Sequence, residues 1–204
     1  MQGKHILLGV TGGIAAYKSA DLVRRLRERG ADLQVVMTHA AREFVSATTF
    51  QALSGRPVRS DLWDASAEAA MGHIELARWA DAVLIAPASA DFLARLAAGM
   101  ADDLLTTVCL ATEAPLAVAP AMNHLMWANA ATRANMVTLG DRGVQIYGPG
   151  EGDQACGETG EGRMLEPLDL ADRLQSLLLH SQGVLAGRRV LITAGPTRER
   201  IDPV

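Results

Sequence analysis

The sequence has 204 residues, with 19 basic and 23 acidic side chains and a formal net charge of −4. This length suits one domain with at most the edge of another, and a hydrophobic content of 49% is enough for a buried core. The mild negative charge excludes the basic footprint of a nucleic-acid-binding protein. No apolar run reaches the roughly 18 residues of a membrane-spanning helix. We therefore expect neither nucleic acid nor a membrane as a partner.

The first residues and the cysteines indicate a reducing compartment. The segment MQGKHILLGVTGG enters a strand-like run without the charged start, apolar stretch and cleavage site of a signal peptide. Two cysteines do not make a disulfide framework. Cys109 lies among apolar neighbours and is expected to be a buried structural thiol, while Cys156 lacks metal-ligand spacing, so no metal site is predicted. We expect a cytoplasmic protein.

Short apolar runs alternate along the chain with amphipathic segments. The runs do not alternate polar with apolar residues, which is typical of parallel strands buried on both faces; they cover residues 5–10, 33–37, 81–87, 115–120 and 144–149. Helical patterns lie between or after them, at 15–30, 91–99, 102–112 and 168–180. This alternation predicts an open, doubly wound α/β sheet with right-handed crossovers. The ligand of such a sheet lies beyond the carboxyl ends of its strands, where we expect the site residues to gather.

The tail differs from the rest of the chain. Residues 187–204, GRRVLITAGPTRERIDPV, open a strand and a Gly-Pro turn, but no complete βα unit follows. We interpret this segment as the first strand of a second domain, which leaves residues 1–186 as the first domain. An edge strand of the first domain's own sheet is the alternative.

A glycine turn follows the first predicted strand. In GVTGGIAAYKS, Gly12 and Gly13 allow a tight turn and close approach to a ligand, and free N–H groups at a helix start favour an anion. The spacing is not that of a dinucleotide fingerprint. It is not a Walker A loop either, because Tyr17 stands where glycine should precede Lys18. A plain tight turn is the alternative interpretation.

Hydroxyl side chains follow the next two strands. Thr38 stands where a dinucleotide-binding protein has an acidic residue for the ribose, and a hydroxyl can donate to phosphate. The combination of Gly12, Gly13 and Thr38 favours a mononucleotide phosphate over NAD as the ligand. Ser89, in APASADF, adds a second group of donors at a strand-to-helix junction. Each residue has an alternative as a helix N-cap, Thr38 for a helix at 39–47.

Six segments in order carry a resemblance to a known family: TGGIAAYK, GHIELARWAD, APASADF, AGMADDLLTT, APAMNHLMW and QACGETGEGRM. Over about residues 5–180 the chain resembles the homo-oligomeric flavin-containing cysteine decarboxylases, in the branch that serves coenzyme A biosynthesis. Residues 187–204 resemble the start of the phosphopantothenate–cysteine ligase domain that bacteria fuse to it in a bifunctional enzyme. The resemblance implies a Rossmann-like or flavodoxin-like fold of three layers, with helices on both faces of a parallel sheet. It also implies FMN near a subunit interface, and homotrimers that assemble further to a dodecamer.

The resemblance also implies which residues contact FMN. The group at the phosphate end is Gly12, Gly13, Ile14 and Thr38, and the group nearby is Ser89, Ala90, Asp91, Phe92 and Ala121. Many relatives carry Asn where this chain has Asp91. Because a carboxylate would be unfavourable beside a flavin phosphate, we expect Asp91 to contribute backbone contacts or to point away.

The implied reaction is the FMN-dependent decarboxylation of 4′-phosphopantothenoylcysteine to 4′-phosphopantetheine. Oxidation of the substrate thiol to a thioaldehyde creates an electron sink, CO₂ leaves, and the resulting enethiol is protonated and reduced. A flavin prenyltransferase-like enzyme is one alternative, and the PAMN segment with its downstream ACG argues against it. A non-catalytic FMN-binding regulatory subunit is disfavoured by the presence of His73 and Asn123. The ligase-like tail argues against a peptidyl-cysteine decarboxylase.

Catalytic roles follow from the same resemblance. It makes His73 the base for the oxidative step, which suits a neutral imidazole, although a lone histidine at a helix start is more often a surface residue. Asn123 would donate to the substrate carboxylate without the ion pair that opposes CO₂ loss, or cap a helix. Met122 joins it in the substrate-binding group. Arg78 would meet a substrate anion or form a solvated ion pair with Glu75.

Cys156 lies in a glycine-rich segment at 148–163, whose six glycines predict a flexible lid. Nearby negative charge raises a thiol pKa and suits a proton donor, and three carboxylates lie close in sequence, those of Asp153, Glu158 and Glu161. The resemblance assigns Cys156 as the acid that protonates the enethiolate, with Ala155 beside it in the substrate site. An incidental surface cysteine is the alternative.

Overall fold

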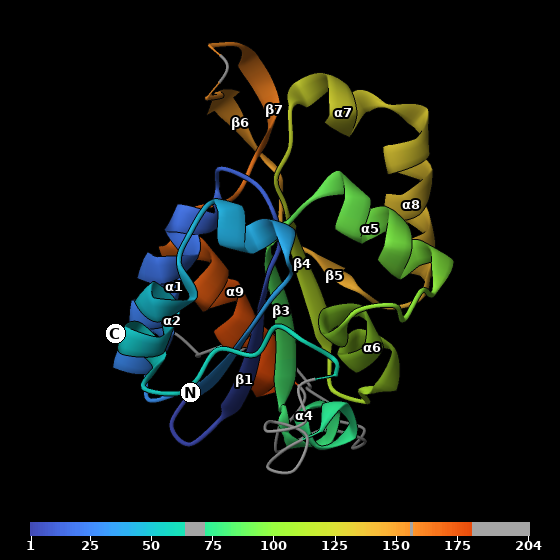
Figure 1. Cartoon of the computed structure of the whole chain (residues 1–204). Helices are drawn as coiled ribbons and strands as arrows, with labels where there is room; N and C mark the ends of the chain where they lie inside the picture. Colours follow the sequence, from blue (N-terminus) through green and yellow to red (C-terminus); the bar gives the residue numbers. More distant parts are fainter. Residues whose placement is uncertain (64–71, 156, 181–204) are drawn as a thin grey trace, which may run out of the picture.

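A five-stranded parallel sheet forms the centre of the molecule (Figure 1). The computed structural model of the chain describes residues 1–63, 72–155 and 157–180. The strand order is β2-β1-β3-β4-β5. The strands are β1 (His5–Val10), β2 (Asp32–Met37), β3 (Ala82–Ala88), β4 (Leu116–Pro120) and β5 (Gln145–Ile146). Four of the five predicted runs therefore match strands to within one residue at each end, and β5 is shorter than predicted.

Helices cover both faces of this sheet, which gives three layers (Figure 1). One face carries α1 (Ala16–Glu28), α2 (Ala47–Ser54) and α9 (Pro167–His180). The other carries α4 (His73–Trp79), α5 (Ala90–Ala98), α6 (Leu104–Ala111) and α8 (Ala130–Asp141). The short helices η1 (Ala40–Glu43) and α7 (His124–Ala128) lie after β2 and β4. The predicted α/β architecture is confirmed.

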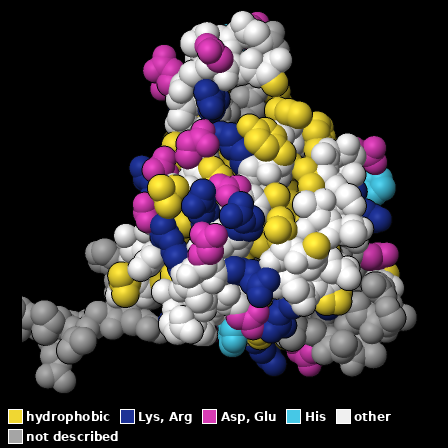
Figure 2. All heavy atoms as spheres, turned by 90° about the vertical axis from the view of Figure 1, so that its left-hand side faces the viewer, with side chains coloured by type: hydrophobic (Ala, Val, Ile, Leu, Met, Phe, Trp, Pro, Cys, Tyr) yellow, Lys and Arg dark blue, Asp and Glu magenta, His cyan; other side chains and the backbone are white. Residues whose placement is uncertain are grey.

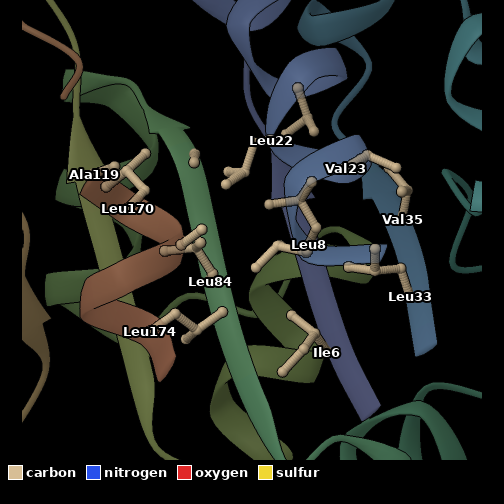
Figure 3. Packing of buried hydrophobic residues seen from close by; sticks show 14 of the residues in the cluster. Ile6, Leu8, Leu22, Val23, Leu33, Val35, Leu84, Ala119, Leu170 and Leu174 are labelled. Carbon is tan, nitrogen blue, oxygen red and sulfur yellow. The ribbon is translucent and has the colours of Figure 1, made fainter. Parts of the chain in front are cut away.

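The core has two parts because neighbouring residues of each strand point to opposite faces. Leu8 and Leu84 pack with Leu22 of α1 and Leu174 of α9 (Figure 3). Their neighbours belong to the second cluster, where Leu7 packs on the opposite face. The strand residues among these side chains lie in the apolar stretches 6–10 and 82–88, as two-sided burial requires.

The middle of the sheet contains a change of winding direction. From β1 the chain passes into α1 on one face, and from β3 it passes into α5 on the other face. The carboxyl ends of these adjacent strands therefore open a crevice, the usual ligand position in doubly wound sheets. Thr11 joins the two ends, since its hydroxyl donates to the Pro87 carbonyl (2.8 Å) and accepts from the Ser89 N–H (2.9 Å).

The predicted helix at 39–47 is wrong. A 3₁₀ turn, η1, covers Ala40–Glu43, and a separate helix α2 begins at Ala47. The physical reason is Ser46, whose side-chain oxygen accepts from the Thr48 N–H (3.2 Å) and caps a new helix.

The glycine-rich segment at 148–163, predicted to be a flexible loop, contains an antiparallel hairpin. Strand β6 (Gly150–Asp153) pairs with β7 (Thr159–Arg163), and the hairpin projects beyond the carboxyl edge of the sheet (Figure 1). Gly162 ties it down, because its carbonyl accepts from the Met122 N–H (2.9 Å) and a Cβ at Gly162 would clash with the Met122 carbonyl. Close backbone approach, rather than mobility, explains this glycine.

Residues 187–204, for which a second domain is predicted, lie outside the described residues. Among the described residues, no helix is both long and apolar enough to cross a bilayer.

Asp81 fastens the amino ends of β1 and β3. Its carboxylate accepts from the His5 N–H (2.8 Å) and from Lys4 Nζ (3.2 Å). Burial alone would raise the Asp81 pKa, but these hydrogen bonds outweigh it and hold the pKa below its ordinary value of 3.8. The contribution of Asp81 to stability is thus full above the unfolded-state pKa and is lost as the pH falls through the folded-state pKa.

We expect Asp81→Asn to lower the free energy of unfolding by about 1 kcal/mol at pH 7, a value reduced for partial exposure. The difference from wild type should shrink below about pH 4, as Asp81 becomes protonated in the wild type. Urea unfolding between pH 3 and pH 7 measures it. Glu113→Gln, at an exposed carboxylate, is the control, and an Asp81→Asn difference that is constant over this pH range would contradict the assignment.

Candidate functional site

A hollow of about 600 Å³ lies at the carboxyl edge of the sheet. It is bounded by the start of α1, the start of α5, the segment after β4 and the hairpin. Nine residues predicted from sequence line it, namely Gly12, Gly13, Ile14, Ser89, Ala90, Ala121, Met122, Asn123 and Ala155. The volume falls within the range of pockets that hold cofactors and small ligands.

One end of the hollow has the character of an anion site. Within the described residues, the backbone N–H groups of Gly12, Gly13 and Ile14 have no hydrogen-bond acceptor. Helix α1 begins directly after them without a side-chain cap, and free N–H groups at a helix start attract anions. Lys18, on the next turn of α1, is buried and places Nζ 2.7 Å from Glu166 Oε1. This end therefore combines free donors with a cation that is already paired.

The predicted hydroxyl residues differ in position. Ser89 lines the hollow and also caps α5, since its oxygen accepts from the Phe92 N–H (3.2 Å). Thr38 does not line the hollow, and its oxygen accepts from the Ala41 N–H (3.3 Å) at the start of η1. The N-cap alternative therefore holds for Ser89, whereas Thr38 contacts the start of the 3₁₀ turn η1 and caps no helix at 39–47.

Besides Thr38, two further predicted cofactor contacts do not line the hollow. The Asp91 side chain is 80% exposed and its carboxylate lies 3.8 Å from the Arg95 guanidinium, outside the lining of the hollow. Phe92 is 1% exposed and belongs to the core beneath α5. Helix periodicity explains this placement, because α5 turns its third residue inward onto the sheet.

Asn123 performs two tasks with two different atoms. Its Oδ1 accepts from the Leu125 N–H (2.9 Å) and caps α7, while its Nδ2 donates to Gln154 Oε1 (3.3 Å) and Glu158 Oε2 (2.6 Å). The cap fixes which way the amide faces, so the donor is directed toward the hairpin side of the hollow. The two interpretations of Asn123 are therefore compatible.

His73 and Arg78 lie elsewhere. Both are on α4, which packs against α6 near the amino ends of the strands, opposite the hairpin (Figure 1). Trp79 at the end of α4 stacks on His5 at the start of β1, with ring centroids 4.6 Å apart. The expectation that every site residue gathers at the carboxyl edge is wrong for these two, because α4 precedes β3 and must lead into its amino end.

Cys156 lies outside the described residues. The carboxylates that surround it in sequence have partners of their own: Asp153 Oδ1 accepts from Thr159 (2.9 Å), Glu158 contacts Asn123, and Glu161 accepts from Trp127 Nε1 (3.0 Å).

Several residues that the sequence prediction missed also line the hollow, among them Tyr17, Lys18, Met126, Gln154, Arg163 and Met164. A signal existed for two of them. Lys18 lies on the first turn of the helix that follows the glycine turn, and Met126 follows the N-cap Asn123 by three positions, about one helical turn. Gln154 carries no such signal, because it enters the site through hairpin pairing.

A cluster of three side chains anchors the hairpin to the helices. Glu161 accepts from Trp127 Nε1 (3.0 Å) and from Arg133 (3.2 Å), and the Arg133 guanidinium lies 4.5 Å from the Trp127 ring centroid. Charge-assisted hydrogen bonds and a cation–π contact reinforce one another here.

We expect Glu161→Ala to increase amide hydrogen exchange in residues 150–163 several-fold, since the hairpin then opens more readily. Exchange in β1 and β3 should stay unchanged. Glu151→Ala removes the carboxylate that faces Glu161 across the ladder and is the matched control. Equal protection of the hairpin in both variants would show that the cluster does not anchor it.

Comparisons with known proteins agree with this architecture. Residues 1–179 match the family described as Flavoprotein, and residues 185–204 match the DNA/pantothenate metabolism flavoprotein C-terminal domain. The coenzyme A biosynthesis bifunctional protein CoaBC of Vibrio cholerae is 61% identical over 204 residues, which are 100% of this chain and 51% of that protein. The chain thus spans about half the length of the curated relatives that it matches.

Two solved structures share the fold. A PPC decarboxylase mutant, with cysteine replaced by serine and complexed with pantothenoylaminoethenethiol, is 31% identical with a TM-score of 0.75, covering 86% of this chain and 98% of that one. The FMN-dependent cysteine decarboxylase SpaF is 30% identical with a TM-score of 0.74, covering 88% and 98%. Since the family match extends over residues 1–179, the chain belongs to the flavoprotein family.

Proposed function

We propose that this chain decarboxylates 4′-phosphopantothenoylcysteine to 4′-phosphopantetheine in coenzyme A biosynthesis, with FMN as cofactor. The observation that carries the proposal is one hollow that contains both the directed amide of Asn123 and backbone N–H groups, at Gly12–Ile14, that have no acceptor among the described residues. Relatives named as PPC decarboxylase and as FMN-dependent cysteine decarboxylases support the reaction and the cofactor.

The residues of the hollow fit FMN. The unpartnered N–H groups of Gly12, Gly13 and Ile14 would hold its phosphate, with the hydroxyl of Ser89 nearby. Bound FMN supplies the two-electron exchange that oxidises the substrate thiol to a thioaldehyde and later reduces the enethiol. Ala121 and Met122 line the hollow between this end and Asn123.

Asn123 orients the carboxylate that leaves. A neutral amide donates a hydrogen bond without the full charge of an arginine, which would hold the negative charge on the carboxylate and oppose CO₂ loss. The N-cap contact to Leu125 keeps the amide from flipping, because the reversed amide would turn its NH₂ group toward a backbone N–H. Asn123 is thereby a preorganised donor.

We propose that His73 acts in the site of a neighbouring copy within a homotrimer that assembles to a dodecamer. Its place on α4, at the end opposite the hollow, supports this arrangement (Figure 1). Apolar side chains at the hollow are unusually exposed, at 61% for Ile14, 60% for Tyr17 and 48% for Met126. Figure 2 shows hydrophobic side chains gathered on the face that carries α1, and such patches mark interfaces. Arg78 lies on the same helix as His73 and would contact an anionic group of the substrate bound in the neighbouring copy.

The remaining roles complete the proposal. Cys156 is the acid that protonates the enethiolate. Ala155, its neighbour in sequence, lines the hollow. Residues 187–204 begin a phosphopantothenate–cysteine ligase domain, which the matches to bifunctional relatives support. The enzyme works in the cytoplasm.

The two glycines of the turn should respond differently to a methyl group. A Cβ on Gly12 would lie 2.6 Å from Ala40 Cβ and 3.1 Å from the Ala40 carbonyl carbon, whereas a Cβ on Gly13 meets nothing within 4 Å. We expect Gly12→Ala to lower the melting temperature of the FMN-free protein. Gly13→Ala should leave that temperature unchanged but weaken FMN binding about tenfold, because its methyl enters the phosphate site.

Thermal unfolding and flavin absorbance after gel filtration measure both effects, with wild type as the reference. A Gly13→Ala protein that stays fully yellow would contradict the phosphate position. A colourless wild type that FMN cannot reconstitute would overturn the proposed function itself.

Asn123→Asp tests the carboxylate site. Aspartate caps helices as well as asparagine, so the cap of α7 should be kept, but the new charge repels the substrate carboxylate. We expect release of CO₂ from 4′-phosphopantothenoylcysteine to fall at least about 100-fold. Asn129→Asp is the matched control, since Asn129 caps α8 in the same way through the Ala131 N–H (2.9 Å) outside the hollow. Near-normal turnover by Asn123→Asp would remove the assignment.

A further inference from the structure

The Glu158 carboxylate accepts a hydrogen bond from the Asn123 amide, the donor that the proposed reaction needs for the substrate. Its Oε2 lies 2.6 Å from Asn123 Nδ2 and 3.4 Å from His124 Nδ1. We propose that Glu158 is a specificity-determining residue: its carboxylate holds the place of the substrate carboxylate at Asn123, and a ligand binds productively only by displacing it. This inference rests on the proposed function and deepens it.

Within the described residues, the hydrogen bonds of Asn123 set Glu158 and a substrate carboxylate in competition. Its Oδ1 is committed to the Leu125 N–H, and its NH₂ group has two hydrogens to offer. One is directed at Gln154 Oε1 at 3.3 Å and one at Glu158 Oε2 at 2.6 Å. The contact with Glu158 is the shorter and the charge-assisted one, hence the stronger. An incoming carboxylate that seeks the same charge-assisted bond must take the hydrogen from Glu158.

The surroundings favour one carboxylate at a time. His124 Nδ1 is buried and has no hydrogen-bond partner within the described residues. The carboxylate oxygen Oε2 of Glu158 lies 3.4 Å from it. Two carboxylates beside one amide would repel each other strongly. The side chain of Glu158 is 49% exposed, so rotation into water releases it without opening of the hairpin.

Exchange at Asn123 separates substrate from product. The substrate carries a carboxylate and can replace Glu158, whereas the product has lost that group as CO₂ and cannot. Once the carboxylate has left as CO₂, Glu158 again accepts the hydrogen bond from Asn123 Nδ2, so the product finds no free donor there. The same device rejects ligands that match the pantetheine portion but lack a terminal carboxylate.

Two unreactive compounds test this exchange. 4′-Phosphopantothenoylalanine has the carboxylate but no thiol, and 4′-phosphopantothenoylethylamine lacks both. Isothermal titration calorimetry with the FMN-loaded full chain measures their dissociation constants. We expect Glu158→Ala to bind the alanine compound about tenfold more tightly than wild type, as one charge-assisted contact no longer has to be broken. Binding of the ethylamine compound should change less than twofold. Glu151→Ala, which removes a carboxylate from the same hairpin, should match wild type for both compounds.

Glu158→Gln guards against a structural effect of the truncation. It keeps an acceptor for Asn123 but no charge, so the gain for the alanine compound should lie between wild type and Glu158→Ala. Unchanged or weaker binding of that compound by both Glu158 variants overturns the inference, even if wild type turns over normally and the proposed function stands. Failure of FMN-loaded wild type to bind or convert any of these ligands overturns the proposed function, and the inference falls with it.

Discussion

The reversal of winding between β1 and β3 is the constraint on which the site depends. Two adjacent parallel strands send their chains to opposite faces of the sheet, so a crevice must open at their carboxyl ends. Thr11 clamps the two ends together and sets Gly12 beside Ser89. Among the described residues, the N–H groups of the glycine turn consequently have no acceptor, because α1 starts there with no side chain to cap it.

The segment after β4 forms the other end of the hollow, where helix α7 begins. A helix start needs an acceptor for its first N–H groups, and Asn123 supplies one through Oδ1. An amide that caps a helix has its NH₂ group left over, with a direction fixed by the cap. Aspartate would cap equally well but leave a second acceptor, so the need for a donor explains why asparagine serves here. Structural and chemical demands therefore meet in one side chain.

Most of the sheet and both ends of the hollow could be predicted from the sequence. Unbroken apolar runs identify two-sided strands, and residues directly after such strands share one edge by geometry, which is why Gly12, Ser89 and Asn123 were found. The hairpin could not be found, since glycine-rich strands have little propensity and arise from pairing and close approach. Gln154 was missed for the same reason. Lys18 lies on the first turn of α1, directly after the glycine turn, and lines the hollow.

The position of His73 follows from topology. A helix that leads into the amino end of β3 cannot also stand at the carboxyl end of the same strand, because the strand of seven residues separates the two edges. The described residues of one copy therefore hold the proposed anion site and the proposed carboxylate donor but place the imidazole at the opposite edge. Under the proposed function, only association of copies brings the two edges together. The exposed apolar residues at the mouth of the hollow, Ile14, Tyr17 and Met126, lie where such an association would cover them. Binding of cofactor and carboxylate would then belong to one chain, and the first chemical step to a pair of chains.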